Sequence, residues 1–220
     1  MIGTTVEATG LDAGELGAVL AEALHDSPLA EHYEPDGARR REVLELKFGA
    51  VVADWLTEPA LPAVRAWLTP CRSAAAVWTH ADYRPEPVEE LETARWVADQ
   101  IGPFGAARYE RAVALAEERE PEVPHHRLRA LATVPHRRRS GLASVVLEPG
   151  LRWCDEGLVP AYLWTAGDEV LPFYRMHGFD VLWTQPVAGG LRLHGLWREP
   201  VAGGVVEGRI PRSRGRSPES

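Results

Sequence analysis

The chain has 220 residues, of which 45% are hydrophobic and 25% are charged, and its formal net charge is −8. This composition is typical of a folded globular protein and excludes a chain that is disordered throughout. The sequence has no run of about 18 apolar residues and no secretory signal pattern, so it predicts no membrane partner. Two cysteines, Cys71 and Cys154, are too few for a disulfide framework or a cysteine zinc site. We therefore expect a cytoplasmic protein.

The charge is distributed unevenly along the chain. Residues 207–220 contain four arginines and two glutamates, so the preceding part of the chain is more acidic than the total suggests. Proteins that bind nucleic acids normally carry a basic surface, and an acidic body disfavours a nucleic-acid partner. Lys47 is the only lysine among the 24 basic residues, so arginine clusters are common here for compositional reasons.

The first two thirds of the chain contain helical patterns and short strands, separated by loops with proline and glycine. Residues 3–9 are predicted as a strand, and Asp12 is expected to cap a helix over residues 13–24. The segment 25–37, which contains two prolines, is predicted as a loop. The pattern then predicts a helix over 38–55, strands over 63–68 and 73–79, a loop over 80–87, and a helical region interrupted near Gly102 and Pro103.

The last third alternates strands and helices. A strand, a helix and a second strand, with about 25–30 residues between strand starts, predict a parallel crossover. Residues 1–202 are predicted as one α/β domain, and residues 203–220, rich in Gly, Arg, Ser and Pro, as a flexible tail. The predicted strands cover 127–134, 159–165, 179–186 and 191–198, the last two forming a hairpin, and the predicted helices cover 141–156 and 169–177.

The segment from Leu131 to Ser144, LATVPHRRRSGLAS, carries the strongest chemical signal. A strand ends, a basic turn follows, and Gly141 opens a helix in the pattern Arg-x-x-Gly-x-Ala. The first N–H groups of a helix are unpaired, and the helix dipole adds positive potential, so such a turn can bind an anion. Gly141 would let the backbone approach a phosphate closely. A solvated basic loop is the alternative interpretation of these residues.

Strand, basic glycine turn, helix, strand and a helix with Phe-Tyr before Gly-Phe, in this order, resemble the GNAT superfamily of acyl-CoA-dependent N-acetyltransferases. The segments VVLEPGLRWCDEGLVPAYLWT and LPFYRMHGFDV, with AAAVWT upstream, resemble the puromycin N-acetyltransferase group and its actinobacterial relatives. The resemblance implies a GNAT fold, which is an α/β fold. Such a fold has a mixed central β-sheet flanked by helices, with a parallel crossover around the coenzyme A site.

The resemblance also implies a reaction and its site residues. Acetyl-CoA is expected as co-substrate, without a metal. Its acetyl group would pass to the amine of a small molecule, antibiotic-like or a biosynthetic intermediate, by direct attack in a ternary complex. Tyr174 is expected to protonate the departing thiolate. The residues expected to bind the coenzyme are Leu131, Ala132, Thr133, Arg138, Arg139, Ser140, Gly141, Leu142, Ala143 and Ser144.

Four positions depart from the pattern of these relatives. Arg139 stands where they usually have Gly, and Ser140 where Lys or Arg is common. Trp164 stands where the puromycin-like enzymes carry Glu, and Val170 where Asn usually precedes the Phe-Tyr helix. The last two departures leave a second hypothesis open, a GNAT-fold protein that binds acyl-CoA without transferase activity or with altered acyl chemistry. A third hypothesis, a nucleic-acid-associated factor, is disfavoured by the acidic body.

Four further residues are candidates for contact with the acceptor. His80 and Tyr83 lie in a loop after a predicted strand, and such loops often reach substrate. Trp164 and His194 lie on predicted strands of the last third. The other histidines, His125, His126 and His136, do not form an i,i+4 pair with a carboxylate, so we expect no metal site. A homodimer is left open.

Overall fold

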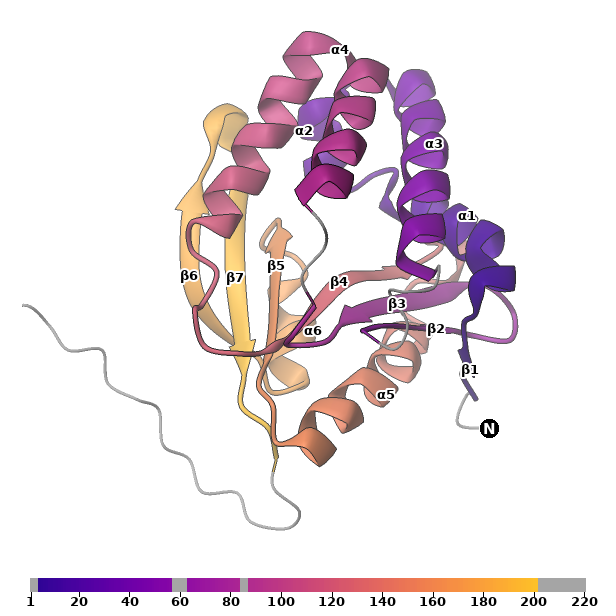
Figure 1. Ribbon diagram of the computed structural model, residues 1–220, viewed down its shortest axis with the longest axis vertical. Coiled ribbons are helices and arrows are strands. Elements are labelled where there is room, and N and C mark those ends of the chain that lie inside the picture. The colour runs from indigo at the N-terminus through magenta and orange to yellow at the C-terminus, as the bar shows by residue number, and fades with distance from the viewer. Residues whose placement is uncertain (1–3, 57–62, 84–86, 202–220) are drawn as a thin grey trace, which may run out of the picture.

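The structure is a computed structural model that describes residues 4–56, 63–83 and 87–201 (Figure 1). Its centre is one seven-stranded sheet with the order β1-β2-β3-β4-β5-β7-β6. Neighbouring strands are antiparallel except for β4 and β5, which are parallel, so the mixed sheet and the parallel crossover are confirmed. The strands are β1 (Val6–Glu7), β2 (Val64–Leu68), β3 (Ala74–Thr79), β4 (His126–Thr133), β5 (Ala161–Ala166), β6 (Asp180–Pro186) and β7 (Arg192–Arg198).

Helices cover both faces of this sheet. In Figure 1, the helices from the first half of the chain lie above it and α5 lies below. A mixed or parallel sheet needs such double cover, because each of its faces carries apolar side chains. The helices are α1 (Ala13–Leu24), α2 (Pro28–Tyr33), α3 (Gly37–Leu56), α4 (Pro87–Glu117), α5 (Leu142–Gly157) and α6 (Leu171–Met176).

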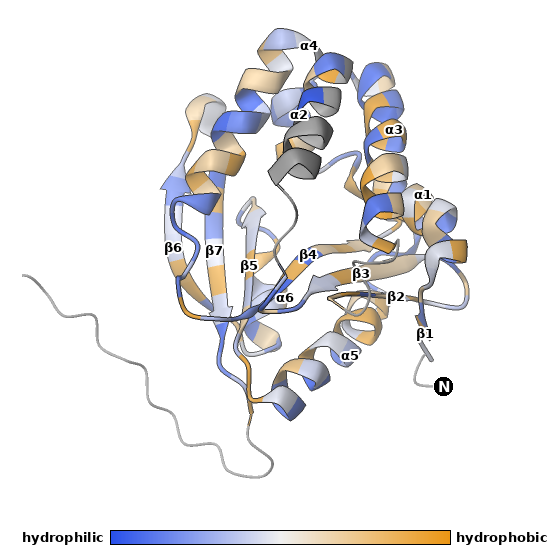
Figure 2. Cartoon of the chain, viewed as in Figure 1, coloured by the Kyte–Doolittle hydropathy of each residue, from blue (hydrophilic) through white to orange (hydrophobic). Residues whose placement is uncertain are grey.

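The core is divided by the sheet into two main clusters. Alternate residues of β3 point to opposite faces: Ala75 and Val77 pack with α1 and α3, whereas Ala76 and Trp78 pack with α5 and α6. All six residues of β3 are buried, and Figure 2 shows most of this strand in the hydrophobic colours. A continuous apolar strand is what burial on both faces requires.

The segment 25–37 differs from its prediction as a loop, because it contains the helix α2. Ser27 caps this helix by accepting a hydrogen bond from the backbone N–H of Ala30 (3.3 Å), and Pro28 occupies the first helical position. Proline fixes a helical φ there and needs no N–H partner. The two prolines that suggested a loop therefore start one helix and follow its end.

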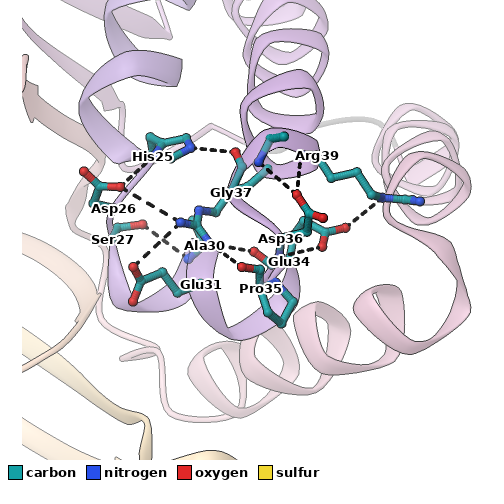
Figure 3. Close-up of polar contacts among 12 residues, drawn as sticks. His25, Asp26, Ser27, Ala30, Glu31, Glu34, Pro35, Asp36, Gly37 and Arg39 are labelled. Atoms are coloured by element: carbon teal, nitrogen blue, oxygen red, sulfur yellow. Dashed lines mark hydrogen bonds and ion pairs between the residues drawn. The ribbon is translucent and has the colours of Figure 1, made fainter.

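Polar contacts hold α1, α2 and the start of α3 together (Figure 3). The Nε2 atom of His25 lies 2.9 Å from the carbonyl oxygen of Gly37, and Asp36 accepts the backbone N–H groups of Ala38 and Arg39 (2.9 and 3.1 Å). Asp36 thus caps α3, and this cap is not among the features predicted from the sequence. The junction fixes the end of α1, which borders the candidate site described below.

Smaller differences from the sequence predictions concern element ends. The predicted strand over 3–9 is reduced to Val6–Glu7, and the side chain of Asp12 bonds Thr9 rather than the first turn of α1. The break near Gly102 is confirmed, because Gly102 has φ 71° inside α4. The hairpin of β6 and β7 is confirmed by their antiparallel register. The predicted tail, residues 203–220, lies outside the described residues.

Candidate functional site

The sheet opens between β4 and β5. Their parallel register contains only two pairs, His126 with Ala161 and Arg127 with Tyr162. Beyond these pairs β4 turns away from β5, which Figure 1 shows as two diverging arrows. The register between β3 and β4 also shifts here, since Trp78 faces Leu128 whereas the preceding residue faces Ala130. This bulge bends β4, and the edge of the strand that would pair with β5 is left available for another group.

A turn with two left-handed residues follows the free end of β4. Arg139 has φ 61° and Gly141 has φ 82°, and α5 begins at Leu142 directly after Gly141. A Cβ atom placed on Gly141 would meet no described atom within 4 Å, so the backbone faces open space. The unpaired N–H groups of the first turn of α5 lie next to this space. An anion could approach the backbone here without a steric barrier.

The structure places the ten predicted coenzyme residues in one strand–turn–helix segment. Leu131, Ala132 and Thr133 end β4, residues 138–141 form the turn, and residues 142–144 start α5. Ala132 is buried toward α1 and α3, whereas the hydroxyl oxygen of Thr133 is buried without a hydrogen-bond partner among the described residues. An unpaired buried hydroxyl normally needs a partner, because leaving it unpaired costs about 1–3 kcal/mol.

The side chain of Arg138 does not project into the open space. Its Nη2 atom donates a hydrogen bond to the carbonyl oxygen of Ala23, near the end of α1 (2.9 Å). A guanidinium at this position satisfies an unpaired carbonyl and lies favourably in the dipole of α1. Arg138 therefore fastens the turn to α1, and its contribution to an anion site would come from its charge and its backbone.

Tyr174 lies in α6, on the face of the sheet that α5 covers. Its ring makes edge contacts with Phe173 and Phe179, with centroid distances of 5.3 and 5.8 Å. Leu131 of β4 packs against the same apolar cluster. Burial raises the pKa of Tyr174 well above its usual value. This phenol therefore keeps its proton at neutral and moderately alkaline pH.

The four predicted acceptor residues do not form one group. Trp164 is half-buried in a small apolar cluster with Leu193, whereas His194, the next residue after Leu193, points to the other face of the sheet. His194 is buried, and its two ring nitrogens lie 2.9 Å from Thr184 Oγ1 and 2.8 Å from Asp168 Oδ1. Both nitrogens of His194 are thus occupied, which is typical of a structural histidine.

His80 and Tyr83, by contrast, line a polar pocket of about 270 Å³ beside the bulge of β4. His125 Nδ1 lies 2.7 Å from the carbonyl oxygen of Val123, and its Nε2 lies 3.3 Å from the carboxylate of Glu120. A second ion pair joins this carboxylate to Arg127. Burial raises the pKa of Glu120, but the hydrogen bond with His125 and the charge of Arg127 together lower it by more. The pKa of Glu120 therefore lies below its usual range. The pocket is lined by Thr79, His80, Ala81, Tyr83, Glu120, Pro121, Glu122, Val123, Pro124, His125, Arg127 and Arg129.

Glu120, Arg127 and Arg129 line the pocket without having been predicted as site residues. The available signal was the alternation of arginines with apolar residues in β4, which places charged side chains on one face of a strand near the middle of the sheet. Within the described ranges, no group of three or more His, Cys, Asp or Glu side chains could hold a metal ion. None of the helices described in the structure has the length and apolar character needed to cross a membrane.

Comparison with known proteins supports the fold independently. No family model matches the chain. A structure of the histone acetyltransferase HPA2 and related acetyltransferase from Corynebacterium glutamicum superposes with a TM-score of 0.60 at 24% identity, over 93% of this chain and 100% of that chain. The ribosomal-protein-S18-alanine N-acetyltransferase from Escherichia coli gives 0.53 at 12% identity, over 93% and 99%.

A putative acetyltransferase of the GNAT family from Desulfovibrio desulfuricans gives a TM-score of 0.50 at 14% identity, over 89% of this chain and 99% of that chain. These similarities concern the fold, and the narrower resemblance to puromycin N-acetyltransferases stays a prediction. The described chain has the GNAT fold. Its mixed seven-stranded sheet opens between β4 and β5 and carries helices on both faces.

Proposed function

We propose that this protein is an acetyltransferase that takes its acetyl group from acetyl-CoA and transfers it to an amine. The observation that carries the proposal is the opening between β4 and β5, which leads directly to the open turn at Gly141. A nucleotide pyrophosphate needs unpaired N–H donors, and an extended pantetheine chain needs a free strand edge. Both features lie on adjacent residues here, and the fold neighbours are acetyltransferases.

The residues at the opening fit the coenzyme. The N–H groups of the first turn of α5 would bind the pyrophosphate, and Gly141 would allow close approach. Thr133, whose hydroxyl has no partner among the described residues, would gain one from the bound molecule. The backbone from Leu131 to Thr133 would hydrogen-bond the pantetheine arm and polarise the thioester carbonyl.

Acyl transfer then needs a neutral amine and a proton for the leaving group. The amine nitrogen attacks the carbonyl carbon, a C–N bond forms and the C–S bond breaks; the proton that the amine loses passes to water, and a Tyr174 that protonates the thiolate recovers its proton from water. Tyr174, which retains its proton because it is buried, would donate a hydrogen bond or a proton to the departing thiolate. Its apolar surroundings strengthen such a hydrogen bond, since water does not compete for it.

The acceptor would enter from the polar pocket beside the bulge of β4. This pocket has the volume of a small molecule and carries both signs of charge, on Glu120 and on Arg127. These features support a small, polar amine-bearing acceptor. A protein acceptor would instead have to reach the pocket with a terminal amine, so a small polar amine is the primary proposal.

A second candidate function is acyl-CoA binding without transfer. Trp164 and Val170 favour it, because both stand at positions where the puromycin-like relatives carry polar side chains. Val170 packs against the cluster that contains Tyr174, and Trp164 packs against Leu193, so neither position supplies a polar group. A protein of this kind would retain the opening and the turn but would lack turnover.

Tyr174→Phe tests the role of Tyr174 in the transferase. The substitution keeps the ring and its packing, so stability and coenzyme A affinity should change little. With an accepted amine, identified by thiol release from acetyl-CoA in a panel of small amines, turnover should fall at least tenfold, because a positioned acid contributes about 10²–10⁴ in rate. An unchanged rate would show that Tyr174 does not assist the departure of the thiolate.

Calorimetry with coenzyme A tests the proposal at an earlier stage. The wild-type protein should bind coenzyme A in the absence of any acceptor. Binding without thiol release for any amine supports the second candidate function, whereas a complete lack of binding contradicts both. Acetylated product, identified by mass spectrometry, would support the transferase.

A further inference from the structure

Ser144 and His177 form a hydrogen-bonded pair at the start of α5, although 33 residues separate them in sequence. Ser144 Oγ lies 2.9 Å from His177 Nε2. Ser144 is in the first turn of α5, three residues after Gly141, and His177 directly follows α6. Both side chains are partly buried.

The direction of this hydrogen bond decides what Ser144 can offer to a ligand. A serine hydroxyl has one proton, and His177 Nε2 can either accept that proton or donate its own. If Nε2 accepts, the hydroxyl proton is used and only an oxygen lone pair faces the turn. If Nε2 carries a proton, it donates to Ser144 Oγ, and the hydroxyl proton is available to an anion.

The surroundings of His177 favour its uncharged form. Burial is the main effect and lowers the pKa of His177, and the charge of Arg198 acts in the same direction. The charge of Glu148, on α5, opposes them. Arg198 is itself paired with Asp155 at 2.8 and 2.9 Å, and its Nε donates to the backbone carbonyl of His177 (3.2 Å).

The backbone carbonyl of His177 is therefore held by Arg198. The ring also packs against Phe173, with a centroid distance of 4.8 Å, which limits its orientation. At neutral pH without ligand, the uncharged ring is favoured, because desolvation disfavours the imidazolium.

We propose that His177 is a positioning residue that turns the Ser144 hydroxyl toward a phosphate of the coenzyme, and that its protonation strengthens coenzyme binding. The inference rests on the proposed function, because it assumes that the pyrophosphate occupies the turn at Gly141. A phosphate oxygen needs a donor, so it selects a state in which Nε2 carries a proton, either the neutral Nε2–H tautomer or the imidazolium. The phosphate charge favours the imidazolium further, since one hydroxyl group separates the two.

The sign of the pH dependence follows from linkage. A ligand that raises the pKa of a group binds more tightly when that group is protonated. Coenzyme A affinity should therefore increase as the pH falls through the pKa that His177 has in the complex. A rise of one unit in this pKa corresponds to a tenfold gain in affinity at acidic pH relative to alkaline pH.

Calorimetric titration of coenzyme A between pH 5.5 and 8.5, with the wild type and with His177→Gln, tests the proposal. The glutamine amide can donate to Ser144 Oγ but does not titrate. The coenzyme phosphates also titrate in this range, so the measured quantity is the ratio of the two affinities at each pH. This ratio should be near one at pH 8.5 and should reach about tenfold in favour of the wild type at pH 5.5.

Three further measurements make the outcome decisive. Ser144→Ala should remove most of the pH dependence, which covers the case in which His177→Gln fails to fold. NMR titration of the wild type should show the His177 pKa rising when coenzyme A is added. His136→Gln, a change just before the turn at a ring whose Nδ1 lies 3.6 Å from Glu22, should retain the wild-type pH dependence.

The failures of the two proposals are distinguishable. A ratio that stays constant with pH while coenzyme A binds overturns the role of His177 and leaves the proposed function intact. Loss of the pH dependence in His136→Gln, with its retention in His177→Gln, also overturns that role. Absence of coenzyme A binding in the wild type contradicts the proposed function, and with it the inference.

Discussion

Arg139 and Gly141 adopt left-handed backbone conformations in the same turn, with φ of 61° and 82°. For residues other than glycine this conformation costs about 1–2 kcal/mol. Arg139 bears this cost, whereas Gly141 does not and also leaves open space beside its Cα atom. Gly141 thus has two roles that can be separated by experiment, one in the backbone and one in access to the turn.

Gly141→Val should weaken coenzyme A binding by at least tenfold. A valine Cβ would meet no described atom within 4 Å, so the loss would come from filling the space that the pyrophosphate needs and from left-handed strain. Isothermal calorimetry measures the affinity, and urea unfolding measures the stability.

Gly190→Val is the matched control for this change. Gly190 has φ 81° and equally open surroundings, but it lies in the turn between β6 and β7. Both variants should lose about 2 kcal/mol of stability from the strained backbone. If the two variants also had the same coenzyme affinity, the assignment of the turn at Gly141 would be wrong.

At the scale of elements, the contact between α5 and β3 depends on one glycine. A Cβ atom on Gly150 would lie 2.2 Å from Trp78 Nε1 and 2.3 Å from Cε2, although Trp78 is fully buried. No real contact is this short, so the indole ring and α5 are in direct contact only because position 150 lacks a side chain. This close approach places the first turn of α5 beside the end of β4.

Gly150→Ala should destabilise the protein by about 1–3 kcal/mol, because overpacking moves α5 or the indole away from the sheet. Gly49→Ala in α3 is the control, since a Cβ atom there meets nothing within 4 Å, and it should stabilise by about 0.5–1 kcal/mol. Urea unfolding of the two variants measures both effects. If Gly150→Ala raised the free energy of unfolding as much as Gly49→Ala does, the described packing of α5 would be wrong.

His126 joins α5 to the loop after β3. Its ring stacks on Trp153 of α5 with a centroid distance of 4.1 Å, and its Nδ1 accepts the backbone N–H of Ala81 (3.1 Å). Burial lowers its pKa to about 4, and the charges of His80 and His125 act in the same direction. Protonation of Nδ1 would also break the hydrogen bond from Ala81.

Stability should therefore fall as the pH decreases from about 6.5 to about 4, because the unfolded chain binds a proton at His126 before the folded chain does. The contribution of uncharged His126 to the free energy of unfolding is complete above pH 6.5 and amounts to about 3 kcal/mol. It is measured as the difference in unfolding free energy between the wild type and His126→Gln at each pH. A difference that does not change across this range would contradict the assigned environment.

At the scale of the whole molecule, the described part of the chain forms one sheet with two packed faces, and residues 204–220 fall outside it. The composition of this segment cannot bury a core, so its deletion should leave stability and coenzyme A affinity nearly unchanged. The expected change in Tm is less than about 2 °C. Thermal unfolding of the shortened chain checks this, and a loss of several degrees would show that the segment packs against the rest.

Local sequence signals were sufficient for most of the fold. Strand and helix order followed from apolar periodicity and from glycine and proline positions, as at the break near Gly102. The prolines at 28 and 35 indicate a loop rather than the helix α2, although Pro28 starts that helix. The residues proposed to bind the coenzyme all lie within the segment 131–144, so their proximity needed no tertiary information.

The sequence by itself determined the strand–turn–helix segment that ends at Ser144, because a turn and a helix start depend on neighbouring residues. Only the tertiary structure decided which distant side chains meet there. It brought His177 to Ser144, turned Arg138 toward Ala23, and formed the pocket from two segments about 40 residues apart in sequence. These contacts depend on how β4 bends at its bulge and how the helices pack on the sheet. No local pattern encodes such long-range packing.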